Sequence, residues 1–205
     1  MAITLVSFPR SGRNWLCTLL DIYYGGPVFN NRLNNPDNPD LGCSNFIGTY
    51  NHDHNANRKI GDRVLYMYRN PVDVVFSMLN SNDVWVKQDK KFKTTDERIR
   101  AWAKRWKNHT KKWRDGVQPN CIDKLVIKYE DLAANPINTL ELICKWIWLN
   151  GTVSKLRCEA AVNAVSKDFV KKICKEDNAI VAFNSKDKET FRQQYGKIIF
   201  SLTGE

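Results

Sequence analysis

Three short apolar runs, each about the length of a strand, punctuate the chain. They are "ITLV" at residues 3–6, "RVLYMYR" at residues 63–69 and "KLVIKYEDL" at residues 124–132. β-branched and aromatic residues dominate these runs, as is typical of buried strands. We therefore predict a strand in each run, the third one ending at residues 129–131.

Segments with helical spacing separate or follow the runs. Asn70 and Pro71 suit the cap and first position of a helix directly behind the second run. Residues 96–115 and residues 135–151 show helical periodicity, and the latter segment is predicted to end at its glycine. The large apolar residues of the segment 96–115 are expected near one helix face: Ile99, Trp102, Trp106 and Trp113.

This alternation predicts an α/β fold, with a mostly parallel central sheet flanked by helices in one domain spanning residues 1–205. The Gly-, Asn- and Pro-rich segment 25–45 is expected to be a long surface loop. The last third of the chain is expected to be helical and basic, and irregular near its end. Ligands of such sheets bind at the carboxyl ends of strands. Three segments with polar residues occupy such positions: Ser7–Asn14, Arg69–Ser77 and Tyr129–Asp131.

The first of these segments, "SFPRSGRNWL", has the form of a phosphate-binding turn between a strand and a helix. In the pattern GxxxxGK[ST], aligned on Gly12, Arg13 replaces the lysine and Asn14 replaces the Ser/Thr that binds Mg²⁺. Gly12 permits an unusual backbone angle, and the following helix offers N–H groups to an anion. Arg10 and Arg13 flank the turn, which favours a metal-free site neutralised by side chains. The alternative is a surface turn with incidental arginines.

The second segment, "YRNPVDVVFS", also places an arginine and a helix start directly after a predicted strand. Arg69, Ser77 and the backbone donors of the helix start are able to converge on a second phosphate. Arg-Asn-Pro at such a turn also serves pure capping, so the segment alone is a weak signal. Two phosphate-binding loops together suggest a ligand with two separated phosphates.

Composition narrows the class of partner. The net charge of the 205 residues is +10, which favours anionic ligands. The six cysteines form no CxxC pair, which is typical of free thiols in a reducing compartment. The chain has no signal-peptide pattern and no apolar stretch of membrane-spanning length, so we expect a soluble cytoplasmic protein.

Four motifs of the chain, the two loops above and two segments further on, occur in the same order as in the cytosolic-type sulfotransferases. The chain therefore resembles these enzymes, which use 3′-phosphoadenosine 5′-phosphosulfate (PAPS). "SFPRSGRNWL" resembles their 5′-phosphosulfate loop and "YRNPVDVVFS" their 3′-phosphate loop. "WKNHTKKW" and "VIKYEDLAANP" are similar to the family's W-x-x-H-x-x-x-W helix and Y-E-D-L-x-x-x-P turn. The resemblance covers residues 3–16 and 64–147.

The resemblance implies a P-loop-like sulfotransferase fold and transfer of a sulfuryl group from PAPS, leaving 3′-phosphoadenosine 5′-phosphate (PAP). The acceptor is expected to offer a hydroxyl or an amine on a small molecule, glycan or lipid. Arg69 and Ser77 would hold the 3′-phosphate, and Tyr129 and Trp15 would approach the adenine or pack in the core. The residues implied around the 5′-phosphosulfate are Arg10, Ser11, Gly12, Arg13, Asn14 and Trp15, with Arg10 in place of the family's catalytic lysine.

The family's catalytic base is a histidine between the two phosphate loops, where this chain has His52 and His54. A histidine with a pKa near 6.5 is suited to take the acceptor's proton. His-Asp at residues 52–53 resembles a family variant, which favours His52 over His54. The alternative is that both histidines lie in a solvated polar loop and have no catalytic role. The pair is unlike a metal site, because no third ligand is evident beside it.

The family's C-terminal phosphate lid is degenerate in "FRQQYGKIIFSLTGE". Arg192 is the residue expected to contact the 3′-phosphate there, with Lys171 and Lys172 as alternatives.

Two other functions compete with sulfuryl transfer. A P-loop kinase would need Mg²⁺ and a carboxylate at the end of a hydrophobic strand to help hold it. Asp131 is the carboxylate nearest to such a position. A nucleic-acid binder would use the basic, Trp-containing helix 98–114, unless its tryptophans face the core.

Overall fold

The computed structural model describes residues 3–26, 28–30, 48–51, 63–80, 94–116, 121–149, 151–165 and 187–205. A parallel sheet with the strand order β2-β3-β1-β4-β5 forms its centre. The strands are β1 (Ile3–Ser7), β2 (Phe29–Asn30), β3 (Gly48–Asn51), β4 (Arg63–Tyr68) and β5 (Asp123–Lys128). The predicted α/β fold with a mostly parallel sheet is therefore confirmed.

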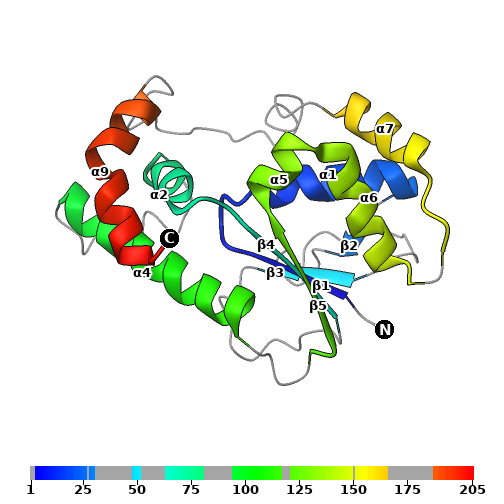
Figure 1. Ribbon diagram of the computed structural model, residues 1–205, viewed down its shortest axis with the longest axis horizontal. Coiled ribbons are helices and arrows are strands. Elements are labelled where there is room, and N and C mark those ends of the chain that lie inside the picture. Colours follow the sequence, from blue (N-terminus) through cyan, green and yellow to red (C-terminus); the bar gives the residue numbers. More distant parts are fainter. Residues whose placement is uncertain are drawn as a thin grey trace, which may run out of the picture.

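Helices cover both faces of this sheet (Figure 1). On one side lie α1 (Arg13–Tyr24), α5 (Tyr129–Ala134), α6 (Pro136–Ile147) and α7 (Lys155–Ala164). On the other side lie α4 (Thr95–Thr110) and the π-helical turn Lys111–Asp115. α2 (Pro71–Leu79) and α9 (Asp187–Thr203) pack on each other and on α4, beyond the carboxyl ends of the strands.

The alternation of side chains along the central strands explains the two layers. In β4, Leu65 and Met67 pack with α1 and α6, whereas Val64 and Tyr66 face the opposite side with Trp113. All four are fully buried. A strand buried on both faces reads as a continuous apolar run, which is why the sequence identified β1 and β4.

The structure corrects several predicted boundaries. The third run ends as a strand at Lys128, and residues 129–134 form α5 instead of extending it. Helix α6 ends at Ile147, four residues before the glycine expected to end it. The expected long loop at 25–45 contains the short strand β2, which pairs with β3. The last residues are not irregular, because residues 187–203 form α9.

The long basic helix is largely as predicted, with one difference at its end. Ile99, Trp102 and Trp106 are buried together against α2 and α9. Trp113 is also buried, but it packs under Val6 and Tyr66 in a separate cluster. It lies in the π-helical turn, whose extra residue per turn rotates it away from the face that the α-helical period predicts.

Candidate functional site

The three predicted site segments leave the sheet side by side. Ser7 at the end of β1 pairs with Met67 of β4, and Tyr68 at the end of β4 pairs with Lys128 at the end of β5. β1 and β4 are neighbours, but the chain continues from β1 towards β2 and from β4 towards β5. Their carboxyl ends therefore flank a topological switch point, where open parallel sheets bind ligands.

The loop after β1 is tightly wound. The backbone N–H of Ser11 donates to the carbonyl of Phe8 at 3.3 Å. Gly12 has a φ of 88° and Arg10 a φ of 66°. A non-glycine residue in the left-handed region costs about 1–3 kcal/mol, and such residues cluster at functional sites.

The loop leads directly into an anion-attracting helix start. Gly12 is the N-cap of α1, and no acidic side chain lies in the helix's first turn. Arg13 and Asn14 occupy that turn, and Asn14 is exposed. Ser11 is 1% exposed, and its Oγ has no hydrogen-bond partner among the residues described. Backbone N–H groups at a helix start and the positive end of the helix suit a phosphate or a sulfate.

The loop after β4 is built by capping. The side chain of Asn70 accepts a hydrogen bond from the Val72 backbone N–H at 2.9 Å, and Pro71 occupies the first helical position. The Asn70 N–H in turn donates to Oε1 of Glu130 at 3.0 Å. Ser77 lies further along α2 and is half-buried. The predicted cap at Asn70 is thus confirmed, and Glu130 anchors it to the third strand end.

Arg69 connects the two loops. Its Nη1 donates to the carbonyl of Arg10 at 3.4 Å, and its own carbonyl accepts from Trp106 Nε1 at 3.1 Å. The Arg69 guanidinium carbon lies 4.4 Å from the ring centroid of Tyr129. The arginine that ends β4 is therefore held beside the loop that follows β1.

Tyr129 packs between the loops. A β-carbon built on Gly12 would come within 2.3 Å of the Tyr129 ring. Trp15 meets the same ring edge-on, at 6.0 Å between centroids, and is 7% exposed. The two aromatic residues predicted to approach the adenine thus form the support beneath the loops.

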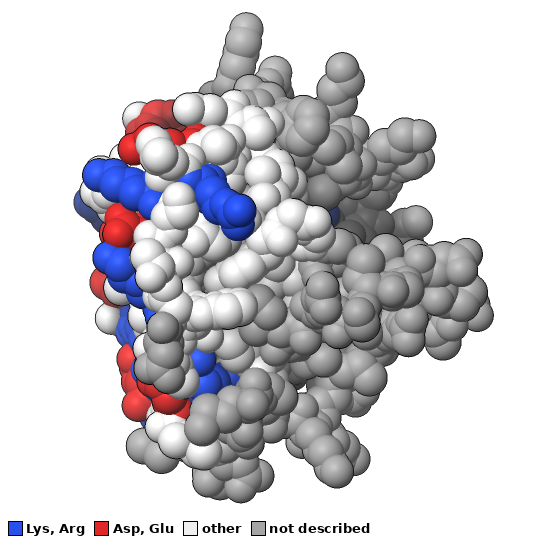
Figure 2. Space-filling model, turned by 90° about the vertical axis from the view of Figure 1, so that its right-hand side faces the viewer, with Lys and Arg blue, Asp and Glu red and all other residues white. Residues whose placement is uncertain are grey.

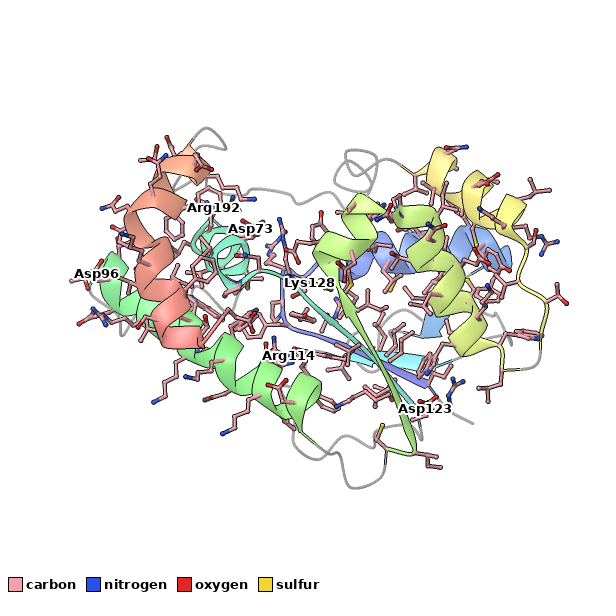
Figure 3. The ribbon with its side chains drawn as sticks, in the orientation of Figure 1. Asp73, Asp96, Arg114, Asp123, Lys128 and Arg192 are labelled. Carbon is pink, nitrogen blue, oxygen red and sulfur yellow. The ribbon has the colours of Figure 1, made fainter. Side chains whose placement is uncertain are left out.

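Asp73 gathers three cationic side chains (Figure 3). Its carboxylate lies 3.1 Å from Arg69 Nη2, 2.9 Å from Lys188 Nζ and 2.9 Å from Arg192 Nη2. Burial acts to raise the pKa of Asp73, but the hydrogen bond from Lys188 and the Arg69 and Arg192 guanidinium groups outweigh it and hold the pKa below its ordinary value. Arg192, predicted as a phosphate ligand, is thereby brought to the second loop from α9.

The candidate bases His52 and His54, and the alternative cations Lys171 and Lys172, lie outside the described residues. Strand β3 ends at Asn51, which pairs with Val6 near the end of β1. The third histidine, His109, is half-buried, with Nδ1 3.1 Å from the Tyr66 hydroxyl and its ring against Phe8. His109 thus packs beneath the first loop, in agreement with a structural role.

The carboxylate expected for a magnesium-dependent kinase does not end a strand. Asp131, the carboxylate nearest to the expected magnesium position, is exposed on α5 rather than at a strand end. Its backbone carbonyl accepts bonds from Asn135 and Thr139. Within the described ranges, no cluster of three or more His, Cys, Asp or Glu side chains is arranged to hold a metal ion.

The basic helix α4 turns its tryptophans inward. Trp102 is 4% and Trp106 1% exposed, so neither presents a ring for stacking on a nucleic-acid base. In the part of the molecule that Figure 2 colours, basic and acidic side chains lie next to one another along one edge. The exposed cations of α4 are Arg98, Arg100, Lys104, Arg105 and Lys107. They form the solvated side of a core-packed helix, as its periodicity allows.

Two further observations lie outside the strand ends. A pocket of about 280 Å³, lined by Tyr24, Arg157 and Ala160 among others, lies at the C-terminal end of α1, opposite its Gly12 end. None of the helices among the described residues has the length and apolar character needed to cross a membrane.

Comparisons with known proteins point to one family. A family model described as "Sulfotransferase family" matches residues 62–151. Residues 62–151 resemble sulfotransferases. This sulfotransferase-like segment contains β4, α2, α4 and β5, and with them Arg69, Asp73 and Tyr129. The resemblance predicted from the motifs is confirmed over this segment, and it supports sulfuryl transfer as the class of chemistry.

Among solved structures, the crystal structure of mouse sulfotransferase SULT7A1 complexed with PAP is similar to this chain. The TM-score is 0.49 and the sequence identity 15%, and the alignment covers 99% of this chain and 88% of that chain. No curated protein is similar enough in sequence to match.

The motifs did not indicate a role for three residues at these strand ends. Asp73 stands four residues after Arg69, a spacing at which helical side chains pair, so a signal was present. Glu130 caps Asn70 from 60 residues away, and Lys188 meets Asp73 across 115 positions. Neither contact has a local sequence signal, because it depends on how α5 and α9 pack.

Proposed function

We propose that this protein is a PAPS-dependent sulfotransferase that moves a sulfuryl group to a hydroxyl or amine acceptor. The observation that carries the proposal is the hydrogen bond from Arg69 to the Arg10 carbonyl, which joins the loop after β1 to the loop after β4 at one switch point. A bisphosphorylated nucleotide is the ligand that fits two adjacent, cationic loops. The sulfotransferase match over residues 62–151 supports the same ligand.

The first loop takes the 5′-phosphosulfate in this proposal. Backbone N–H groups at the start of α1, with Ser11, hold the phosphate, and Arg10 and Arg13 supply the positive charge. As the acceptor oxygen or nitrogen bonds to sulfur, the bond from sulfur to the phosphate oxygen breaks. Charge then grows on that oxygen, where preorganised cations and helix-end donors stabilise it most.

The second loop takes the 3′-phosphate, through Arg69 and Ser77, with Arg192 reaching it from α9. Arg192 and Arg69 already share Asp73, so both guanidinium groups lie at this position. For Tyr129 and Trp15 we propose two contributions: the adenine contact implied by the resemblance, and support of the loops from beneath.

The proposed catalytic base is His52, with His54 as the alternative. β3 lies next to β1 and ends at Asn51, the residue directly before His52. Ligands of open parallel sheets bind at the edge formed by the carboxyl ends of their strands, which is where the family's histidine would be needed. His52 would accept the proton that the acceptor loses. The acceptor itself is proposed to be a small molecule, a glycan or a lipid.

Binding of PAP measured by calorimetry tests the proposal most directly. We expect PAP to bind without added metal, and more tightly than ATP with Mg²⁺, whereas the reverse order would indicate a kinase. Sulfur-labelled PAPS offered with a panel of hydroxyl and amine acceptors then tests transfer. Failure of the wild-type protein to bind PAP would overturn the proposal.

Arg10→Gly is the sharpest variant for this test. Arg10 has a positive φ, which glycine adopts without steric cost, so the substitution relieves backbone strain while it removes the guanidinium. We expect PAP affinity to fall at least tenfold with the protein still folded. Arg10→Lys restores the charge without the planar fork and shows whether the phosphosulfate needs bidentate contact.

A further inference from the structure

We infer that Asp73 is a positioning residue that assembles a phosphomonoester site from two distant parts of the chain, with Lys188 as its third cation. The inference rests on the proposed function, because it concerns the 3′-phosphate of the same nucleotide. It adds Asp73 as a positioning residue and Lys188 as a cation to Arg69, Ser77 and Arg192, which the proposed function already assigns to this phosphate.

The first argument is charge. Three cations, Arg69, Lys188 and Arg192, surround one carboxylate, which leaves two positive charges in excess. Glu189 approaches Arg192 only at 3.9 Å and is 68% exposed, so solvent screens it. A phosphomonoester carries about −1.5 to −2 at pH 7, which matches the excess, whereas a phosphodiester carries about −1.

The second argument is accessibility. Asp73 is the inner member of the cluster, with its side chain 10% exposed. The side chains of Lys188 and Arg192 are 38% and 44% exposed. The carboxylate thus holds the cations from the protein side, while their outer faces stay open to an anion in solvent.

The third argument is chain connectivity. α9 begins at Asp187, and Lys188 and Arg192 stand one turn apart on it. Both contact Asp73, one on each carboxylate oxygen: Lys188 on Oδ2 and Arg192 on Oδ1. Arg69 shares Oδ2 from the turn before α2. The three cations therefore keep their spacing only while Asp73 is ionised and α9 is docked on α2.

The experiment compares the affinity for PAP with that for adenosine 5′-phosphate, which lacks the 3′-phosphate, in wild type and in Lys188→Gln. We expect Lys188→Gln to lower PAP affinity about tenfold, the loss of one charge-assisted contact, and adenosine 5′-phosphate affinity less than twofold. Lys197→Gln is the matched control, since Lys197 is an exposed lysine half a turn out of phase on the same helix. It should leave both affinities unchanged.

Asp73 is tested through its coupling to Lys188. Asp73→Asn should lower PAP affinity, Asp73→Glu should restore most of it, and the double variant Asp73→Asn/Lys188→Gln should lose no more than the weaker-binding single variant. Hydrogen exchange in the first two turns of α9 should rise in Asp73→Asn and not in Lys197→Gln. If Asp73→Asn does not fold, the affinities of Lys188→Gln and Arg192→Gln for PAP and for adenosine 5′-phosphate still test whether these cations bind the 3′-phosphate.

The outcomes separate the two proposals. Equal wild-type affinity for PAP and adenosine 5′-phosphate would remove the 3′-phosphate site, and with it the proposed function. A wild-type preference for PAP that persists unchanged in Lys188→Gln would leave the proposed function intact and overturn this inference. Additive losses in the double variant would show that Asp73 does not act through Lys188.

Discussion

The ring of Tyr129 lies directly against Gly12. A β-carbon on Gly12 would approach Cδ2 of Tyr129 to 2.3 Å and Cε2 to 2.5 Å. The same ring carries the Arg69 guanidinium at 4.4 Å from its centroid. The side chain that begins α5, directly after β5, therefore contacts both the loop after β1 and the arginine after β4.

Gly12→Ala should consequently be far more damaging than Gly25→Ala. Both glycines have positive φ, 88° and 75°, so both substitutions carry a left-handed backbone cost of about 1–2 kcal/mol. Only Gly12 faces an overlapping ring, because nothing lies within 4 Å of a β-carbon at Gly25. Overpacking adds about 1–3 kcal/mol to the loss at Gly12. Urea denaturation measures the difference, and equal losses would contradict the contact.

Asn70→Ala and Ser154→Ala remove two N-caps of similar strength at different distances from the site. Asn70 accepts from Val72 N–H at 2.9 Å, and Ser154 accepts from Arg157 N–H at 3.3 Å. Each substitution should lower the free energy of unfolding by about 1 kcal/mol. Only Asn70→Ala should also weaken PAP binding, since that cap positions the second loop. Equal PAP affinities in both variants would argue against a phosphate role for that loop.

The contribution of ionised Asp73 to the free energy of unfolding should depend on pH. Its pKa is lower in the folded protein than in the unfolded chain, so its contribution is present above pH 3.8 and is lost as the pH falls through the folded value. Asp73→Asn should be less stable than wild type by about 1–2 kcal/mol at pH 7, a figure reduced because its partners Lys188 and Arg192 are over a third exposed.

That gap should narrow as the pH falls from 3.8 through the folded pKa of Asp73, because wild-type Asp73 then loses the charge that the variant lacks. Denaturation curves at pH 7, 5 and 3 measure it. Asp96→Asn, a substitution of an exposed carboxylate in the first turn of α4, is the control. A gap that stays constant over the range would show that the charge of Asp73 is not what stabilises the fold.

His52→Ala should lower the rate of sulfuryl transfer by about 10²- to 10⁴-fold, the usual contribution of a general base. PAP affinity should stay unchanged, because the base acts on the acceptor rather than on the nucleotide. His54→Ala is the matched comparison and should keep most of the activity. If His54→Ala is inactive and His52→Ala is active, His54 would be the catalytic base instead of His52.

Two buried thiols should resist modification in the native state. Cys144 and Cys158 are fully buried, and burial raises the pKa of Cys144 to about 12 and also raises that of Cys158. Both therefore stay protonated at pH 8, and a thiol-reactive probe should label them only after unfolding. Cys121, which is partly exposed, is the internal control. Labelling of Cys144 as fast as Cys121 in the native protein would contradict this packing.

The sequence predicted the parts of the site whose signals are local. Arg10, Gly12, Arg69 and Asn70 each stand where an apolar run stops, and a run buried on both faces is visible without a structure. The helix start after Asn70 was likewise predictable, because a cap and a proline act within a few residues. Strand pairing then brings those ends to one edge, as the rule for parallel sheets leads one to expect.

Other features depended on long-range packing. The end of β5 at Lys128 was mispredicted, since an apolar run carries no signal for a strand that turns into a helix. The last third of the chain was correctly predicted to contain helix, but its end was expected to be irregular, because the sequence of α9 is only weakly amphipathic. Tyr129 against Gly12, Glu130 on Asn70 and Lys188 on Asp73 join residues between 60 and 117 positions apart.

The sequence by itself thus predicted which residues are candidates for anion binding and at which strand ends they lie. Only the tertiary structure decided which of them meet, because capping and periodicity are local, whereas a salt bridge between α2 and α9 exists only once the two helices pack against each other.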